Sequence, residues 1–230
     1  MKANRPSLIL YFTALFFTIL FDIFQYDYLT ICMKSIVVPS IFFYFYSSNN
    51  FRINKIQILV FALCFTGEVF HLMNVEISDL GSMLCFLLVY LTLLKMIVID
   101  ERRKIKFKKN DVLPIVLVVL LIVYLLFSVL SLQFDKMRDF HFFYGLYGSV
   151  LSALGIICYA KYITRGTYLG LLLTLMITCF IFSDIFFIFN EYFSYSLVLI
   201  LIRDITQILA YFFMAKYFIL CSKGKRSSRL

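Results

Sequence analysis

The sequence predicts an all-α fold: a polytopic membrane helix bundle with eight transmembrane helices in a single integral membrane domain, residues 1–230. Three observations lead to this prediction. The 230 residues are 63% hydrophobic and only 15% charged, whereas soluble domains carry about 25% charged residues. The apolar residues fall in long blocks, and the loops between the blocks alternate in charge.

Each apolar block is near the roughly 20 residues that a helix needs to cross the hydrocarbon layer. Lipid offers backbone N–H and C=O groups no partner, so the blocks are expected to be helices. The blocks use up almost the whole chain, and any chemistry must therefore take place inside the bundle. The expected spans are 7–25, 29–46, 55–73, 80–99, 112–132, 140–162, 167–189 and 195–220.

The spans differ in the residues that interrupt them. No small-x-small cleavage signal follows the first span, which is therefore expected to be retained. Pro39 should kink the second span. The third and seventh spans carry the acids Glu68 and Asp184, and glycines such as Gly148 make the sixth a close-packing helix.

Loop charge predicts the orientation of the bundle. With eight spans, both termini lie on one side, and the loops of that side carry sixteen basic residues. They are Lys2, Arg5, Arg52, Lys55, Arg102, Arg103, Lys104, Lys106, Lys108, Lys109, Lys161, Arg165, Lys223, Lys225, Arg226 and Arg229. The opposite loops hold only Lys136 and Arg138 with seven acids. Basic loops stay in the cytoplasm, so both termini are expected to be cytoplasmic.

This topology also accounts for the net charge of +9. Basic loops attract anionic lipid headgroups, so membrane lipids are the expected partners and no nucleic acid is expected. The sequence does not indicate an oligomeric state. The basic loop 101–111 separates two halves of four spans each, approximately 1–100 and 112–220.

The third span of each half carries a similar motif. In 67–74 and 183–190, a small residue precedes the acid, a β-branched residue and Phe follow it, and Asn comes six residues after it. Four spans per half keep both copies in the same orientation. The motif therefore favours a parallel 4+4 repeat, related by an axis along the membrane normal.

Polar residues within the spans gather in the expected outer half of the membrane. A charge at the centre of a span costs about 2.5–3.5 kcal/mol on insertion scales, and such residues usually face a cavity or a partner. We expect a polar pocket that opens outward, in which Glu68 and Asp184 converge. The polar set comprises Lys34, Glu68, His71, Asp184, Arg203, Asp204 and Gln207.

Helical spacing refines this set. Glu68 and His71 share one helix face, as do Asp204 and Gln207. Arg203 is expected to point away from Asp204, towards Asp184 or Glu68. The alternative is that the charges only pair to hold the bundle together.

A metal site is not expected. Glu68-x-x-His71 resembles half of a di-metal site, but such a site needs a second motif of this kind, and Phe187 occupies the corresponding place after Asp184. The six cysteines form no CxxC pair, so neither zinc nor a disulfide framework is expected. We expect no cofactor.

Several short motifs occur together along the chain. They are Lys34-Ser-Ile-Val-Val-Pro39, Gly67-Glu68, Phe86-Leu-Leu-Val-Tyr90, Ser183-Asp184, and the helix from Gln207 to Tyr211. In this order and spacing, from the second span to the eighth, the chain resembles the YhhN-type lysoplasmalogenase family. That family usually has Asp where this chain has Glu68, and commonly His where it has Tyr90.

The resemblance implies hydrolysis of the vinyl ether bond of a lysophospholipid, giving a fatty aldehyde and a glycerophospho-base. Glu68 and Asp184 would share the catalytic roles, one as a protonated acid and the other as an ionised carboxylate. Lys34 and Arg203 would hold the phosphate, and Gln207 and Asp204 would orient the head or the water. His71 and Tyr90 complete the expected substrate-binding set. The expected location is a bacterial cytoplasmic (inner) membrane.

The main alternative is a non-catalytic lipid-binding or small-solute transport protein that uses the same pocket. Polar residues lie on one side of the membrane only, which favours an enzyme or a binder over a transporter. A retinal-type photoreceptor would need a buried lysine in the last span, and Lys216 lies too near the cytoplasmic end.

Overall fold

The computed structural model describes residues 5–73, 78–99, 111–131, 141–193 and 195–227, and these residues form helices without strands. Eight of the helices are long and apolar enough to cross a membrane, so the chain is an integral membrane protein. They are α1 (Arg5–Ile23), α2 (Asp27–Ser48), α3 (Lys55–Leu72), α4 (Ser78–Ile99), α5 (Val112–Ser131), α6 (His141–Arg165), α7 (Tyr168–Ile188) and α8 (Leu197–Ser227).

Each helix corresponds to one expected span, and nearly all ends agree within three residues. The exception is α8, which continues to Ser227 rather than ending near residue 220. Its last turns contain Lys223, Lys225 and Arg226, which end the apolar block but not the helix. The basic residues at 102–109 lie outside the described residues.

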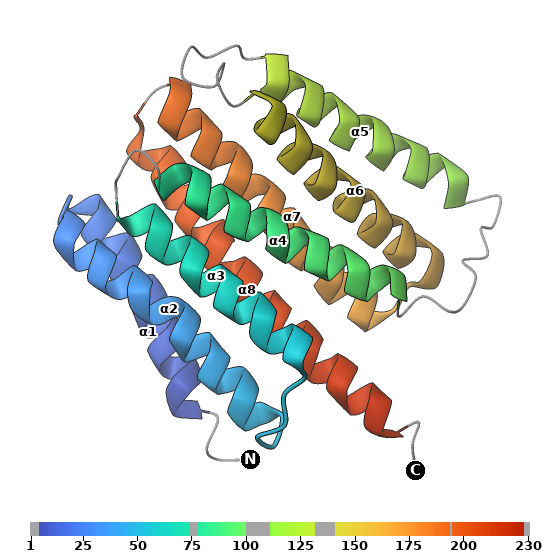
Figure 1. The fold of residues 1–230 in the computed structure, drawn as a ribbon, viewed down its shortest axis with the longest axis horizontal. Helices are drawn as coiled ribbons and strands as arrows, with labels where there is room; N and C mark the ends of the chain where they lie inside the picture. Colours follow the sequence, from blue (N-terminus) through green and yellow to red (C-terminus); the bar gives the residue numbers. More distant parts are fainter. Residues whose placement is uncertain (1–4, 74–77, 100–110, 132–140, 194, 228–230) are drawn as a thin grey trace.

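Successive helices run antiparallel and pack as neighbours, except that α4 packs against α6 rather than α5, and α8 also packs against α1 and α2 (Figure 1). The core is rich in aromatic side chains, and Tyr90, Tyr211, Phe45, Phe180 and Phe218 are almost completely buried. By contrast, α5 lies at the edge of the bundle and buries only Ile122. It packs chiefly against α6.

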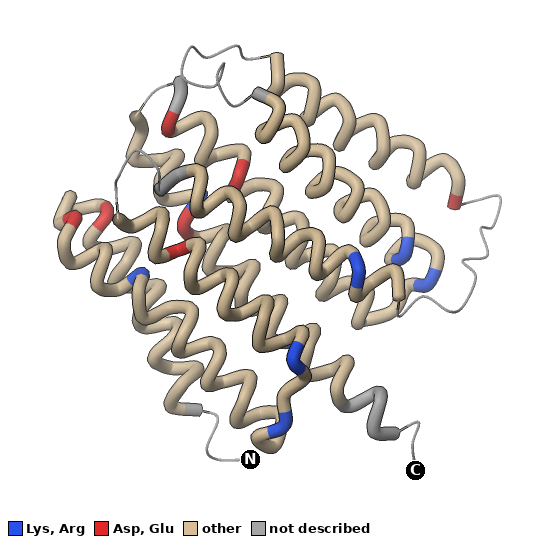
Figure 2. The backbone as a smooth tube through the Cα atoms, viewed as in Figure 1, with Lys and Arg blue, Asp and Glu red and all other residues tan. Residues whose placement is uncertain are grey.

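The beginning of α1 and the end of α8 lie at the same end of the bundle (Figure 1). Most of the described Lys and Arg residues gather towards this end, whereas most of the described Asp and Glu residues lie towards the other (Figure 2). A small group of both signs lies inside the bundle, within the half that carries the acids. The charge separation predicted from the loops is thus visible in the described helices as well.

Beyond Ile188, α7 continues into a π-helical turn, Phe189–Phe193. The Asn190 side chain accepts a hydrogen bond of 3.1 Å from the Ser196 backbone N–H, which ties this turn to the start of α8. Asn190 therefore has a structural partner. The corresponding Asn74 lies outside the described residues.

Candidate functional site

Asp204 is the centre of an ionic cluster between α2, α3 and α8. Lys34 Nζ lies 2.7 Å from Asp204 Oδ2, and Arg203 Nε and Nη2 each lie 2.9 Å from Oδ1. Asp204 is only 3% exposed. The expectation that Arg203 points away from Asp204 is wrong, because its long side chain folds back onto the adjacent carboxylate. In a medium of low dielectric constant the closest opposite charge dominates.

His71 joins this cluster through Arg203. Arg203 Nη1 lies 3.2 Å from His71 Nε2, and the His71 ring packs edge-on against Phe187 of α7, with 5.3 Å between centroids. The side chains three positions after the two acids, His71 and Phe187, are therefore in contact.

Glu68 is held by two side chains of α8. Gln207 Nε2 donates a hydrogen bond of 2.6 Å to Glu68 Oε1, and the Tyr211 hydroxyl donates to the same oxygen. Glu68 is buried. Since a carboxylate in a dry interior needs donors, these contacts explain why α8 carries an amide and a phenol one turn apart.

Asp184 belongs to a second group, which we call the acid–tyrosine cluster: Asp184, Tyr90 and Tyr147. The hydroxyls of Tyr90 and Tyr147 each donate a 2.7 Å hydrogen bond to Asp184 Oδ2. The two hydroxyls lie 3.3 Å apart, and the rings are tilted with 5.4 Å between centroids. Three helices, α4, α6 and α7, thus fix one oxygen of Asp184.

Tyr147 is not among the residues that the sequence motifs single out, because the glycines of the sixth span suggest only close packing. The depth of Tyr147 within its helix could have indicated that it lies near Asp184. Tyr147 comes six residues after the start of α6, and Asp184 comes four residues before the end of α7. Since these helices are antiparallel neighbours, the two side chains lie at a similar level.

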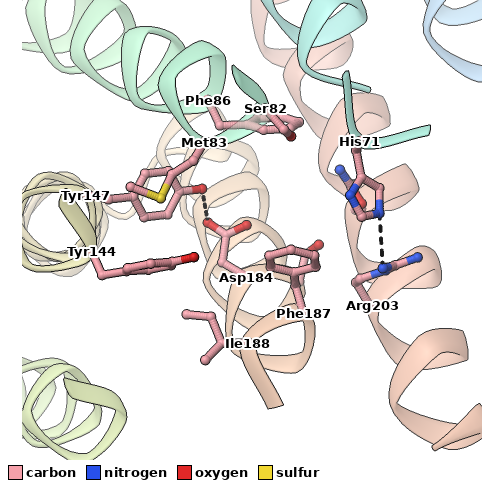
Figure 3. A pocket seen from close by; sticks show the side chains of 12 residues that line it. His71, Ser82, Met83, Phe86, Tyr144, Tyr147, Asp184, Phe187, Ile188 and Arg203 are labelled. Atoms are coloured by element: carbon pink, nitrogen blue, oxygen red, sulfur yellow. Dashed lines mark hydrogen bonds between the residues drawn. The ribbon is translucent and has the colours of Figure 1, made fainter. Parts of the chain in front are cut away.

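A cavity of about 60 Å³ lies between the ionic cluster and the acid–tyrosine cluster. His71 and Arg203 lie on one side, and Asp184 and Tyr147 lie on the other (Figure 3). Gln207 also lines this cavity. The second carboxylate oxygen of Asp184 points away from Tyr147 into this space. A cavity of this size has room for a few water molecules.

Glu68 and Asp184 line different cavities within the described part of the chain. Glu68, Lys34 and Asp204 surround a separate cavity of about 10 Å³. Gln207 lines both this cavity and the larger one. Tyr90 lines neither and acts on Asp184 by hydrogen bonding. The two acids expected to converge therefore have different partners, with Gln207 between them.

Chemically, the larger cavity combines a carboxyl group held by two phenols with a guanidinium group on the opposite wall. A carboxyl in this position can give or take a proton at a group bound in the cavity, and the guanidinium can pair with an anion. No group of three or more His, Cys, Asp or Glu suited to a metal ion is found within the part of the chain that the structure describes.

Compared with models of protein families, with curated proteins and with solved structures, the chain has no match.

Proposed function

We propose that the protein hydrolyses the vinyl ether bond of a lysophospholipid, releasing a fatty aldehyde and a glycerophospho-base. The observation that carries the proposal is Asp184: two phenols occupy one of its oxygens, and the other faces a cavity with Arg203 and His71 across it. The motif resemblance to the YhhN-type lysoplasmalogenase family supports the same chemistry.

In the proposed reaction Asp184 begins protonated and gives its proton to the alkenyl carbon, forming an oxocarbenium ion on the ether carbon. The carboxylate stabilises this cation and then takes a proton from the attacking water. The hemiacetal that forms collapses to aldehyde and glycerol hydroxyl, and its hydroxyl proton passes to the leaving oxygen. Asp184 ends as it began, and no further reactant is required.

The other residues take supporting roles in this proposal. Arg203 attracts the phosphate, with His71 beside it. Glu68 is assigned a role in positioning Gln207 rather than in proton transfer, because Glu68 lies in a different cavity from Asp184. Lys34 and Asp204 hold Arg203 in place through the ionic cluster.

The test is aldehyde release by the purified protein from an alkenyl lysophosphatidylcholine. Asp184→Asn should lower the rate at least about 100-fold, the usual contribution of an acid–base group. Glu191→Gln, the same kind of change at an exposed acid beyond α7, should leave it unchanged. In D₂O the aldehyde should carry one deuterium on the carbon next to the carbonyl. Undiminished release by Asp184→Asn would overturn the assignment.

The competing proposal is a membrane protein that binds amphiphiles without cleaving them. The small cavity and the separation of the two acids favour it. Binding of the alkenyl lysophospholipid with no aldehyde above the level of the Asp184→Asn variant would select this alternative.

We further propose that the two halves are a parallel repeat. In support, α2 packs on α8 as α6 packs on α4. Tyr211 of α8 donates to Glu68 of α3, and Tyr90 of α4 donates to Asp184 of α7. Each half thus supplies a tyrosine to the acid of the other half, as a two-fold relation requires.

The proposed orientation has both termini in the cytoplasm of a bacterial cell, with the candidate cavity opening towards the outer face of the cytoplasmic membrane. The distribution of Lys and Arg in the loops supports it, because basic loops remain on the cytoplasmic side. The substrate would then reach the cavity from the outer leaflet.

A further inference from the structure

A second cavity, of about 70 Å³, lies between α5, α6 and α7 and adjoins the first at Asp184. Both cavities are lined by Tyr144, Tyr147, Asp184 and Ile188. Beyond these shared residues the second cavity is almost wholly apolar, with aliphatic side chains from 122 to 130 of α5 forming one wall. A polar space and an apolar space therefore meet at one carboxyl group.

The helix α5 is suited to let a molecule in from the side. Its only buried residue among those described is Ile122, and it packs chiefly against α6. Figure 1 shows it at the edge of the bundle. In a bilayer no hydrophobic force holds one apolar helix against another, because lipid chains are equally apolar. Moving α5 outward therefore exchanges protein contacts for lipid contacts at little cost.

We propose that this slot between α5, α6 and α7 binds the hydrocarbon chain of a single-chain amphiphile that enters from the bilayer beside α5. The phosphate of its head lies in the first cavity, beside Arg203 and His71. The atoms that join head and chain then lie at Asp184, where the proposed hydrolysis would act. For that reaction the inference rests on the proposed function, whereas binding does not depend on it.

Gly148 of α6 lines the slot and faces α5. A Cβ on Gly148 would come within 2.6 Å of Leu126 Cδ1, so a larger side chain there fills the space between α5 and α6. Gly145, three residues earlier on the same helix, offers a matched control, because a Cβ there would meet nothing within 4 Å.

The experiment uses a saturated alkyl ether lysophosphatidylcholine with a diazirine in the chain, photolysed with the full-length protein in nanodiscs. Labelling should concentrate on peptides of α5 and α6. In variants that melt like the wild type, labelling should fall at least about tenfold in Gly148→Leu and to an intermediate degree in Gly148→Ala. Labelling of Gly145→Leu should change little. Unlabelled lysophospholipid should compete, and a two-chain phospholipid should not.

Labelling of α1 as strong as that of α5 would overturn the inference, and so would undiminished labelling of Gly148→Leu or equal competition by a two-chain lipid. The pattern in the wild-type protein decides even if Gly148→Leu does not fold. The probe has no vinyl ether, so its labelling does not depend on hydrolysis. The expected labelling pattern without aldehyde release from the alkenyl substrate would overturn the proposed function and leave this inference standing. Aldehyde release together with uniform labelling would overturn this inference and leave the proposed function standing.

Discussion

The side-chain amide of Gln207 donates a 2.6 Å hydrogen bond to Glu68, and the same side chain lines the cavity that Asp184 faces. Two acids that are 116 positions apart in the sequence are thus linked through a residue of a third helix. A change at Gln207 is therefore expected to affect both the packing around Glu68 and the reaction at Asp184.

Gln207→Leu should lower both stability and aldehyde release. It leaves Glu68 with Tyr211 as its donor and replaces a polar wall of the cavity with an apolar one. A lost hydrogen bond to a carboxylate costs about 1.5–3 kcal/mol. Thr206→Val is the control, because within the described residues the Thr206 hydroxyl donates to carbonyls of its own helix. If melting temperature and rate are the same in both variants, the linking role of Gln207 is wrong.

Tyr90→Phe and Tyr147→Phe should each slow aldehyde release modestly, and the double variant should be slowed by more than the product of the two effects. Both hydroxyls donate to the same oxygen of Asp184, so either can partly replace the other, whereas their joint loss leaves that oxygen without a phenol. Groups that share a partner are expected to be non-additive. Rates of the four proteins in this double-mutant cycle are the measurement.

The control for this cycle is Tyr159→Phe, which removes a tyrosine hydroxyl from α6, the helix that carries Tyr147. Tyr159 pairs with Thr178 of α7 at 2.7 Å, twelve residues from Tyr147 on α6 and six residues from Asp184 on α7. Its rate should match the wild type. Simple additivity of Tyr90→Phe and Tyr147→Phe would mean that the phenols do not act through one oxygen.

Asp204→Asn should destabilise the protein more than Lys34→Met does. The first change leaves both Lys34 and Arg203 without their carboxylate, and breaking a buried ion pair costs about 3–5 kcal/mol. The second leaves the Arg203–Asp204 pair intact. Asp27→Asn, at an exposed acid in the first turn of α2, should cost at most about 1 kcal/mol, the usual interaction of an acid with a helix N-terminus. Melting temperatures in detergent give the order, and a larger loss in Lys34→Met would contradict it.

Most of the fold could be predicted from hydropathy, because lipid allows few alternatives to long apolar helices. The place of α5 at the edge of the bundle could not, since α5 and the interior α7 are both apolar throughout most of their length. Hydropathy measures transfer to lipid and does not distinguish a lipid-facing helix from one surrounded by other helices.

The candidate site was predicted as a set of residues but not as an arrangement. Six of the residues expected around one pocket, Lys34, Glu68, His71, Arg203, Asp204 and Gln207, form contacts across α2, α3 and α8, while Asp184 has other partners. Sequence spacing indicates helix faces and depth, but it does not indicate which of several carboxylates a flexible arginine side chain pairs with. A signal that went unused is that Tyr90 and Tyr211 are each followed by Lys five residues later.

The predicted topology can be tested with a short epitope inserted into the full-length protein. An epitope within 132–140 should be accessible to antibody in intact spheroplasts, whereas one within 101–110 or after Leu230 should become accessible only after lysis. The reason is that Lys and Arg near a span oppose its transfer across the membrane, and loop 101–110 carries six of them. An epitope on a known periplasmic protein controls for access, and one on a cytoplasmic protein controls for leakage. Accessibility of the 101–110 epitope before lysis would reverse the orientation and place the candidate cavity on the cytoplasmic side.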